Sequence, residues 1–385
     1  MGGGYLRALI LAGGRGTRLH PITLRTPKCL LPIAGKPNIL HMVEELNNAG
    51  VKDVFVSIND NQLKVNDFLQ DKKVNIIIES QEDSKLGSIG GLNYAVNKLG
   101  NHDLIVLGAD NFYKGIDIRD FSSSIKEGSA LIALYKVPHE YMIEELGIAE
   151  LKGDQIVSFQ EKPNINEARS RLGSTLIYGL SSEWLKNKFP AYLDSGADRD
   201  TIGRMWQYFC DKDELYGYVF NGTWADIGTT RSYIELNNKV MSEMKESRIN
   251  DSITVGEGSV IEDNVIIEEG CIIGRDCVIG PNTHLMKDTT IGQGSRVKGS
   301  VLFENTHVGK NSAINNSVVD GFAIINNNVV VDDFCAIGFK AVIESDSRLL
   351  KRSNVWPFIT ARGVINGNVT YREGRDDLIN SKYWS

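Results

Sequence analysis

The sequence predicts a mostly parallel α/β sheet followed by a parallel β-helix, and three observations support this fold class. Apolar runs of strand length alternate with helical patterns from Leu6 to about Asn237. From Ile249 onward an aliphatic residue recurs at every sixth position. Between the two parts, a helical pattern loses its apolar stripe near Glu246. The length of 385 residues also suggests two domains, each able to bury its own core.

The N-terminal part alternates predicted strands and helices. Runs rich in Val, Ile and Leu are typical of strands that are covered on both faces. Two helical patterns between them end at Gly50 and Gly100, which suit the end of a helix. Ligands bind beyond the carboxyl ends of the strands in such sheets, so the residues that follow the runs are site candidates. The strand candidates are LRALILAG, VKDVFVSI, KVNIIIES, HDLIVLGAD and GSALIALYKV.

The C-terminal part has a hexapeptide repeat. Nine aliphatic residues at six-residue spacing run without interruption from Ile249 to Val297. After two slips of one residue the series continues to Ile343. A parallel β-helix has this pattern because each coil takes three hexads and buries one aliphatic side chain per face. We therefore predict an α/β domain over 1–246, a β-helix over 247–345, and a tail over 346–385 that caps the coil or joins a subunit contact.

Composition and charge exclude several functional classes. The net charge of −7 gives no electrostatic reason to expect nucleic acid or an anionic membrane as a partner. The chain has no apolar stretch long enough for a membrane span and no signal-peptide pattern at its start, so we expect a cytoplasmic location. Its five cysteines are scattered and form no CxxC pair, so we expect no structural zinc site.

The stretch LAGGRGTRLHPITLRTPK, residues 11–28, has the composition of an anion-binding loop. Between Met1 and Val43 the chain has six basic residues and no Asp or Glu, although it is acidic overall. The stretch does not contain GxxxxGK[ST], and it fails the GxGxxG pattern because Leu19 stands at the third glycine position. Its glycines follow a predicted strand and leave backbone N–H groups free to approach a phosphate. The alternative is a glycine turn with solvated basic side chains.

The same stretch resembles the signature of the sugar-1-phosphate nucleotidyltransferases, GGxGTRLxPxTxxxPKxLxPxxxxP. This resemblance implies a Rossmann-like nucleotidyltransferase domain and a left-handed parallel β-helix. It also implies Mg²⁺-dependent transfer of a nucleotidyl group from an NTP to a sugar 1-phosphate, with release of pyrophosphate. Arg18 and Lys28 are the implied catalytic residues on the triphosphate, and the implied nucleotide-binding residues are Leu11, Ala12, Gly13, Gly14, Gly16 and Thr17.

The implied reaction depends on charge neutralisation more than on a strong base. Its nucleophile is already an anionic phosphate oxygen, so the site must hold two anions in line and stabilise the leaving pyrophosphate. Mg²⁺ needs few carboxylates when phosphates and water complete its shell. Asp110 in LIVLGADNFY and Asp226 in NGTWADIGT resemble the metal-binding aspartates of the family. The alternative is that Asp110 caps a turn and that Asp226 caps the helix predicted near Thr229.

Three further segments resemble parts of the family's substrate site. Glu161 and Lys162 in SFQEKP match an EKP motif, which implies that the Glu binds sugar hydroxyls and that the Lys contacts the sugar phosphate as a catalytic residue. A surface turn is the alternative. Gly147 in LGIAEL stands where the family has a glycine close to the sugar. Gln81 and Gly87 in SQEDSKLGSIGG resemble the segment that binds the base.

One segment departs from the family pattern. Members commonly have an Asn-Ala-Gly-Ile-Tyr run at the sugar site, whereas this chain has Ser-Thr-Leu-Ile-Tyr from Ser174 to Tyr178. We expect Ser174 and Tyr178 to contact the sugar, and Leu176 to narrow the pocket. The overall likeness is to long members that carry a β-helix. It leaves open a mannose 1-phosphate guanylyltransferase and a glucose 1-phosphate uridylyl- or thymidylyltransferase.

Two alternatives to a simple transferase remain open from the sequence. A non-catalytic regulatory subunit would bind an NDP-sugar, and loss of Lys28 or an aspartate would indicate it, but all are present. An acyltransferase in the β-helix would need a histidine base, for which only His284 and His307 are available there. We expect a homo-oligomer assembled through the β-helix.

Overall fold

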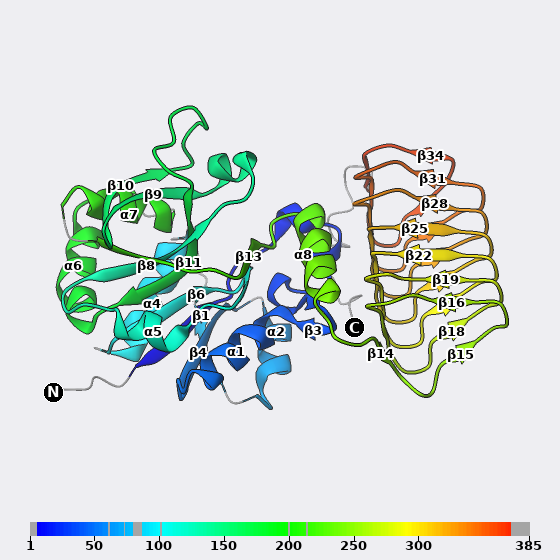
Figure 1. Ribbon diagram of the computed structural model, residues 1–385, viewed down its shortest axis with the longest axis horizontal. Coiled ribbons are helices and arrows are strands. Elements are labelled where there is room, and N and C mark those ends of the chain that lie inside the picture. Colours follow the sequence, from blue (N-terminus) through cyan, green and yellow to red (C-terminus); the bar gives the residue numbers. More distant parts are fainter. Residues whose placement is uncertain are drawn as a thin grey trace. The chain divides into compact units, whose positions relative to one another are not determined.

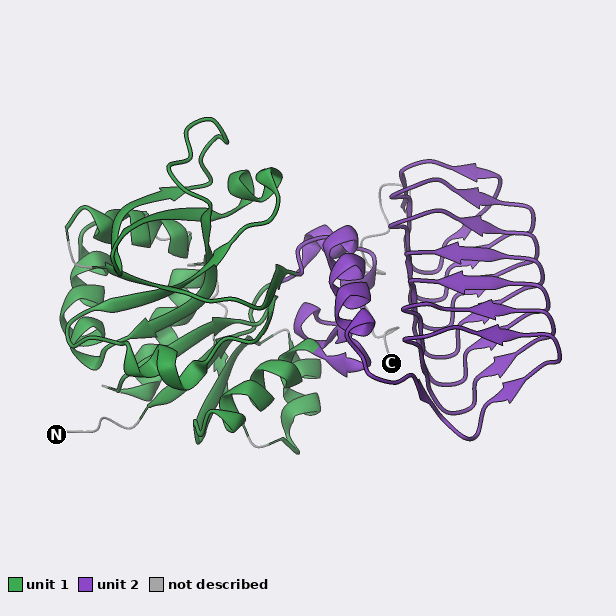
Figure 2. Cartoon of the chain, in the orientation of Figure 1, with its two compact units in different colours: residues 1–14, 38–226 green, residues 15–37, 227–385 purple. Residues whose placement is uncertain are grey.

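The computed structural model divides into two compact units (Figures 1 and 2). Unit 1 combines Met1–Gly14 with Asn38–Asp226, and unit 2 combines Arg15–Pro37 with Ile227–Ser385. The predicted phosphate loop therefore starts in unit 1 and continues in unit 2. The described residues are 6–60, 62–72, 74–79, 87–100, 102–198, 201–212 and 215–370.

Unit 1 is built on a nine-stranded sheet in the order β5-β4-β1-β6-β11-β8-β12-β10-β9. Strands β10 and β11 run opposite to the other seven, so the sheet is mostly parallel as predicted. Strands β1, β6, β11 and β8 run through the middle of this unit (Figure 1). The strands are β1 (Arg7–Leu11), β4 (Asp53–Asn59), β5 (Asn75–Glu79), β6 (Leu104–Gly108), β8 (Ala130–Lys136), β9 (Gly147–Lys152), β10 (Gln155–Glu161), β11 (Leu172–Leu180) and β12 (Leu215–Val219).

Helices and a second small sheet complete unit 1. All five residues of β6 are buried, as expected of a central strand with both faces covered. The core of this unit includes Trp184, Trp206 and Phe209 from two of the helices. The helices are α1 (Asn38–Asn48), α2 (Leu63–Leu69), α4 (Gly87–Leu99), α5 (Ile118–Ser123), α6 (Ser182–Asp194) and α7 (Ile202–Cys210), with a 3₁₀ segment η4 (Glu140–Glu145) and a sheet of β7 (Asn111–Lys114) and β13 (Thr223–Asp226).

Most of unit 2 is a parallel β-helix of short strands, drawn as the stacked coils in Figure 1. Its three sheets contain eight, seven and seven strands. The first has β14 (Arg248–Ile249), β17 (Ile266–Ile267), β20 (His284–Leu285), β23 (Val301–Leu302), β26 (Val318–Val319), β29 (Ala336–Ile337), β32 (Asn354–Val355) and β35 (Asn368–Val369). The second has β15 (Thr254–Val255), β18 (Ile272–Ile273), β21 (Thr290–Ile291), β24 (His307–Val308), β27 (Ile324–Ile325), β30 (Val342–Ile343) and β33 (Thr360–Ala361). The third has β16 (Val260–Ile261), β19 (Val278–Ile279), β22 (Arg296–Lys298), β25 (Ala313–Asn315), β28 (Val330–Val331), β31 (Arg348–Leu349) and β34 (Val364–Ile365).

The hexapeptide spacing explains the interior of these coils. In most of these two-residue strands the second side chain points inward. These aliphatic side chains form one continuous buried cluster. Corner residues with positive φ are often Asn or Asp, such as Asn264, Asp276 and Asn282. These residue types tolerate the left-handed conformation better than most.

The stack of coils extends beyond the predicted end at Ser345. Strands β31 to β35 follow, and the last of them ends at Val369. Leu349, Val355 and Ala361 keep the six-residue spacing and are buried. The small Ala361 and the polar and aromatic residues between these positions weaken the repeat in the sequence. Residues 371–385 of the predicted tail lie outside the described residues.

The rest of unit 2 consists of one helix and the segment 15–37. Helix α8 (Thr230–Ser242) begins with a capping box, in which the Thr229 side chain accepts a hydrogen bond from the Ser232 N–H at 3.1 Å. None of the helices in the described ranges combines the length and apolarity that a membrane crossing requires. The segment folds as η1 (Thr17–Leu19), η2 (Ile22–Leu24), η3 (Lys28–Leu30) and the hairpin β2 (Pro32–Ile33) and β3 (Lys36–Pro37).

Candidate active site

The start of the predicted phosphate loop lies at the carboxyl ends of three neighbouring parallel strands. Leu11 is in register with Ser57 of β4 and with Gly108 of β6. The Ala12 N–H donates to the Ser57 carbonyl at 2.8 Å, and the Ala109 N–H donates to the Leu11 carbonyl at 2.9 Å. The residues that follow β1 and β6 are therefore side by side at the edge where such sheets bind ligands.

Two polar side chains hold the backbone of Gly13 and Gly14 in place. Asn59 Nδ2 donates to the Gly13 carbonyl at 2.7 Å, and Gln62 Nε2 donates to the Gly14 carbonyl at 3.1 Å. A Cβ on Gly13 would lie 2.9 Å from Asn59 Oδ1, so this close approach requires glycine. A Cβ on Gly14 would meet nothing within 4 Å. The exposed side of this turn is thus open to a ligand.

The β7–β13 ladder brings Asp110 and Asp226 together. Asp226 is in register with Asn111, the residue directly after Asp110. Asn111 Nδ2 donates to Asp110 Oδ1 at 2.8 Å. Asn38 is fully buried and donates through Nδ2 to the carbonyls of Ala109, at 3.0 Å, and Asn111, at 2.8 Å, which fixes the turn that carries Asp110. Asp110 directly precedes β7, so the two aspartates lie at the same end of this small sheet.

This pair of aspartates fits a divalent cation that also binds phosphates. Within the described ranges, no group of three or more His, Cys, Asp or Glu side chains is placed to hold a metal. Two carboxylates suffice for Mg²⁺ when phosphate oxygens and water complete its shell. The cap of α8 is Thr229, so capping does not explain Asp226.

Glu161 and Gly147 face each other across the β9–β10 ladder. A Cβ on Gly147 would lie 3.1 Å from Glu161 Oε2 and 2.5 Å from the ring of Phe159. On the other side, a Cβ on Gly203 of α7 would lie only 1.8 Å from Glu161 Oε2. Burial raises the pKa of Glu161, and the charges of Lys162 and Arg204 oppose this only in part. Two glycines thus make room for one half-buried carboxylate.

Lys162 has an unusual backbone conformation. Its φ of 49° lies in the left-handed region, which costs free energy for a residue with a Cβ. Its N–H donates to the Leu146 carbonyl at 3.0 Å. Such strain is concentrated at functional sites.

The segment from Ser174 to Tyr178 forms an irregularity in β11. The register with β8 shifts between these two residues, and Leu176 has a φ of 57°. A Cβ on Gly108 would lie 3.2 Å from the Leu176 Cβ, so the leucine packs on the end of β6. The Tyr178 ring is buried at 4.9 Å from Trp206, and burial raises its pKa to about 12. Tyr178 therefore remains a neutral phenol.

The other predicted phosphate residues lie on the segment 15–37 of unit 2. Gly16 has a φ of 63°, and Thr23 Oγ1 donates to its carbonyl at 2.7 Å. A Cβ on Gly16 would be 3.2 Å from the Cβ of Lys28. Lys28 is buried, whereas Thr17 and Arg18 are exposed on η1. This segment thus folds back on itself and brings Gly16 next to Lys28.

Only one of the two residues predicted to bind the base lies in the described part of the chain. Gln81 lies outside the described residues. Gly87 is the first residue of α4 and has a φ of 66°, as a residue at a tight entry to a helix requires. Glu79, which ends β5, is buried and accepts a hydrogen bond from Ser57 Oγ at 2.6 Å. Glu79 thus contacts the residue that pairs with Leu11, and nothing in the sequence marked it as part of this region.

Comparison with known proteins establishes the family. The Nucleotidyl transferase family model matches residues 7–243, and the model described as GMPPB C-terminal domain matches residues 261–366. The chain belongs to the nucleotidyl transferase family. The predicted sugar-1-phosphate nucleotidyltransferase enzyme is thereby confirmed, as is the predicted succession of a Rossmann-like α/β sheet and a parallel β-helix.

The relatives of this nucleotidyl transferase cover most of its length. The bifunctional protein GlmU of Methanococcus vannielii is 32% identical over 81% of this chain and 77% of its own length. The mannose-1-phosphate guanylyltransferase 1 of Arabidopsis thaliana is 28% identical over 82% of this chain and 86% of its own length. A solved structure of a protein named as a glucose-1-phosphate thymidylyltransferase, from Bacillus anthracis, has a TM-score of 0.54 at 25% identity and covers 62% of this chain and 96% of that one.

Proposed function

We propose that the protein catalyses Mg²⁺-dependent transfer of a nucleotidyl group from an NTP to a hexose 1-phosphate. The observation that carries the proposal is the β7–β13 ladder, which holds Asp110 and Asp226 beside the carboxyl ends of β1 and β6. Bound Mg²⁺ would neutralise charge on the phosphates as pyrophosphate leaves. The named relatives include a guanylyl- and a thymidylyltransferase, which supports a hexose phosphate and leaves the base to experiment.

Within this proposal, the site residues predicted from the sequence are assigned the following roles. Leu11 and Ala12 are assigned to the nucleoside, while Gly13 and Gly14 are proposed to leave room for its phosphates. Gln81 and Gly87 are proposed to contact the base, and Gly147, Glu161, Ser174 and Tyr178 the sugar. Gly16, Thr17, Arg18 and Lys28 are assigned to the triphosphate, and Lys162 to the sugar phosphate. With both anions held in line, the phosphate oxygen of the sugar attacks the α-phosphorus without a general base.

Pyrophosphate release from a matrix of NTPs and sugar 1-phosphates tests this proposal. GTP, UTP and dTTP, each with mannose 1-phosphate or glucose 1-phosphate, are the pairs to assay first. We expect release with at least one pair, and its loss when EDTA removes divalent cations and its return when Mg²⁺ is added. No release with any pair would contradict the proposal.

Matched aspartate variants test the metal assignment. Asp110→Asn and Asp226→Asn should each lower kcat/KM by on the order of 10²- to 10³-fold, because each removes a charge at the reacting phosphates. Asp154→Asn is the control, since this exposed carboxylate of unit 1 pairs only with Lys126 on the surface. If Asp110→Asn and Asp226→Asn keep the activity of the Asp154→Asn control, the metal assignment is refuted.

The acyltransferase alternative is not supported by its two histidines. His284 is fully buried, and its Nε2 lies 2.7 Å from Glu268 Oε1. His307 is exposed on the outer face of β24. Consumption of acetyl-CoA with an amino-sugar phosphate would revive this alternative. Homo-oligomerisation through the β-helix stays a prediction that light scattering can test.

A further inference from the structure

The three outer faces of the β-helix differ in burial. On the eight-stranded sheet the outward residues of the five middle strands are almost fully buried, whereas Arg248, Asn354 and Asn368 on the other three strands are not. The buried outward residues are Ile266, His284, Val301, Val318 and Ala336. The other two sheets expose outward residues such as Ile272, Ile324 and Val364. One face of the coil is therefore covered within unit 2.

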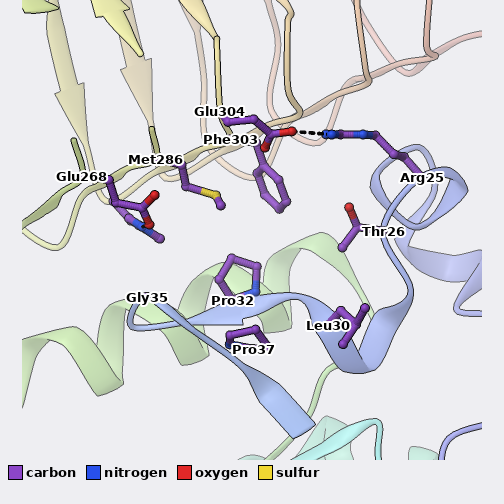
Figure 3. Close-up of a pocket in the computed structure, with 11 residues that line it drawn as sticks. Arg25, Thr26, Leu30, Pro32, Gly35, Pro37, Glu268, Met286, Phe303 and Glu304 are labelled. Carbon is purple, nitrogen blue, oxygen red and sulfur yellow. Dashed lines mark hydrogen bonds and ion pairs between the residues drawn. The ribbon is translucent and has the colours of Figure 1, made fainter. Parts of the chain in front are cut away.

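The segment 15–37 contributes to this cover, and Arg25 is its main polar contact. The guanidinium forms ion pairs with Glu304 and with Asp320, the latter at 3.1 Å (Figure 3 shows the pair with Glu304). It also lies over the ring of Phe339, 4.5 Å from the centroid. The Gly321 N–H donates to Asp320 Oδ1 at 2.7 Å and holds that carboxylate in place. One arginine thus joins three successive coils.

A second set of contacts holds the far end of the segment. The Tyr233 hydroxyl donates to the Pro32 carbonyl at 2.9 Å, and the Ala34 N–H donates to Asn237 Oδ1 at 2.9 Å. Arg248 donates to the Ala34 carbonyl. Helix α8 and the first coil therefore fix the β2–β3 hairpin, whereas Arg25 fixes the part nearer to Arg18.

The contact around Arg25 is not closely packed. A pocket of about 350 Å³ separates the segment from the coils, with Pro32 and Pro37 on one side and Met286 and Phe303 on the other (Figure 3). Close packing normally fixes the position of a segment, and an open gap removes that restraint. The polar contacts of Arg25 consequently carry more of the positioning here.

We propose that Arg25, Glu304 and Asp320 are positioning residues for NTP binding, through which the β-helix sets the position of Arg18 and Lys28. Arg25 precedes Lys28 by three residues, and Lys28 packs against Gly16. A shift of Arg25 toward or away from the coil therefore moves both cationic residues of the segment. The inference rests on the proposed function, in which Arg18 and Lys28 bind the triphosphate.

Gly321→Ala is the sharpest test because it keeps every charge. The new Cβ would lie 2.7 Å from Arg25 Nη1 and 3.0 Å from Glu304 Oε1, and the Gly321 backbone is outside the left-handed region that would disfavour alanine. We expect the KM for NTP and the calorimetric Kd for NTP to rise on the order of 10-fold or more, because small misplacements of binding groups are costly. The KM for the sugar 1-phosphate should stay within about twofold.

Arg25→Gln and Glu304→Gln give a second, independent test. Each should raise the KM for NTP, and the double variant should be no worse than Arg25→Gln alone, because Arg25→Gln already removes the contact with Glu304. Arg275→Gln is the matched control, since it breaks an exposed Arg–Glu pair with Glu257 on the same β-helix.

The outcomes separate this inference from the proposed function. If the wild type releases no pyrophosphate with any pair, the proposed function fails. If the wild type is active and the three variants, folded as judged by circular dichroism, keep the wild-type KM and Kd for NTP, the positioning role is refuted. Equal increases in the KM of both substrates would also refute it, because they would indicate a general structural defect.

Discussion

At the scale of single residues, the space around Glu161 depends on glycines that come from different elements. Gly147 is in register with Glu161 in the sheet, but Gly203 reaches it from α7. A Cβ at position 203 would lie 1.8 Å from Glu161 Oε2, so a larger residue there would displace the carboxylate. The helix is thus built around the side chain that the proposed function assigns to the sugar.

Gly203→Ala should therefore disturb sugar binding more than folding. Displacement of the Glu161 carboxylate is expected to raise the KM for the sugar 1-phosphate by on the order of 10-fold, the effect of one lost charged hydrogen bond. The KM for NTP should change little. Gln207→Ala, an exposed position of the same helix, controls for the new alanine. Unchanged sugar kinetics in a folded Gly203→Ala protein would remove Glu161 from the sugar site.

At position 176 this chain has a leucine where family members commonly have a glycine, and the difference affects the backbone conformation. A glycine adopts its φ of 57° freely, whereas a leucine does so at a cost of about 1 kcal/mol. Leu176→Gly should broaden the range of accepted sugar 1-phosphates, because it removes a side chain that packs on the end of β6. A panel of hexose and N-acetylhexosamine 1-phosphates measures this. An unchanged ranking of kcat/KM would show that Leu176 does not limit the pocket.

The sequence predicted residues that lie in motifs and missed those that act through tertiary contacts. Asp110 was predicted because it follows an apolar run, and Asp226 because it stands between an aromatic residue and a glycine turn in a stretch that resembles the family. Nothing local marks Asn38 or Gly203, since their roles depend on backbone carbonyls and a carboxylate far away in the chain. Buried asparagines and glycines of this kind become visible only when the fold is known.

At the scale of elements, the inward residues of the hexapeptide strands follow a regular pattern, whereas the outward residues differ from coil to coil. The periodicity predicted the coils correctly, because burial of one aliphatic residue per face repeats at every turn. It could not predict which outer face is covered. The continuation past Ser345 was missed for a related reason, since Ala361 fills an inward position with too little apolar bulk to stand out in the sequence.

The buried carboxylate of Asp320 gives the coil a pH-dependent stability. Burial raises its pKa from 3.8 to about 6, which the charge of Arg25 offsets only in part. The folded state therefore keeps a proton that the unfolded chain has already lost between these values. The stability that this proton contributes is fully present below pH 3.8 and is lost as the pH rises through 6.

Relative to Asp320→Asn, the wild type should consequently lose stability between pH 5 and pH 7. Urea unfolding followed by circular dichroism at pH 5, 6, 7 and 8 measures the difference. Asp332→Asn controls for loss of a carboxylate, because Asp332 pairs with the exposed Arg348 on the same coils. A wild-type advantage that grows with pH over this range would mean that the ion pair with Arg25 outweighs burial.

At the scale of the whole molecule, each unit has a core of its own. One contains Ile132 and the aromatic residues of α6 and α7, and the other consists of the aliphatic residues inside the coils, including Ile337. Both isoleucines are fully buried. Separate cores predict separate cooperative transitions when the protein is heated.

Differential scanning calorimetry with two core variants tests this prediction. Ile132→Ala and Ile337→Ala should each cost about 2–5 kcal/mol, the usual effect of truncating a buried isoleucine. Each should lower the midpoint of one transition and leave the other in place. A single transition that both variants lower equally would show that the two units unfold as one.

The ion pair between Arg25 and Asp320 also has a consequence for the order of events during synthesis. These partners are 295 residues apart in the chain, so the ribosome releases the signature segment long before the coils that support it. At typical elongation rates of about 5–20 residues per second, the delay lasts roughly 15 s or longer. During this time the segment lacks its ion pair with Asp320. Under the proposed function, the enzyme therefore acquires its final nucleotide-binding geometry only after the coil that carries Asp320 has formed.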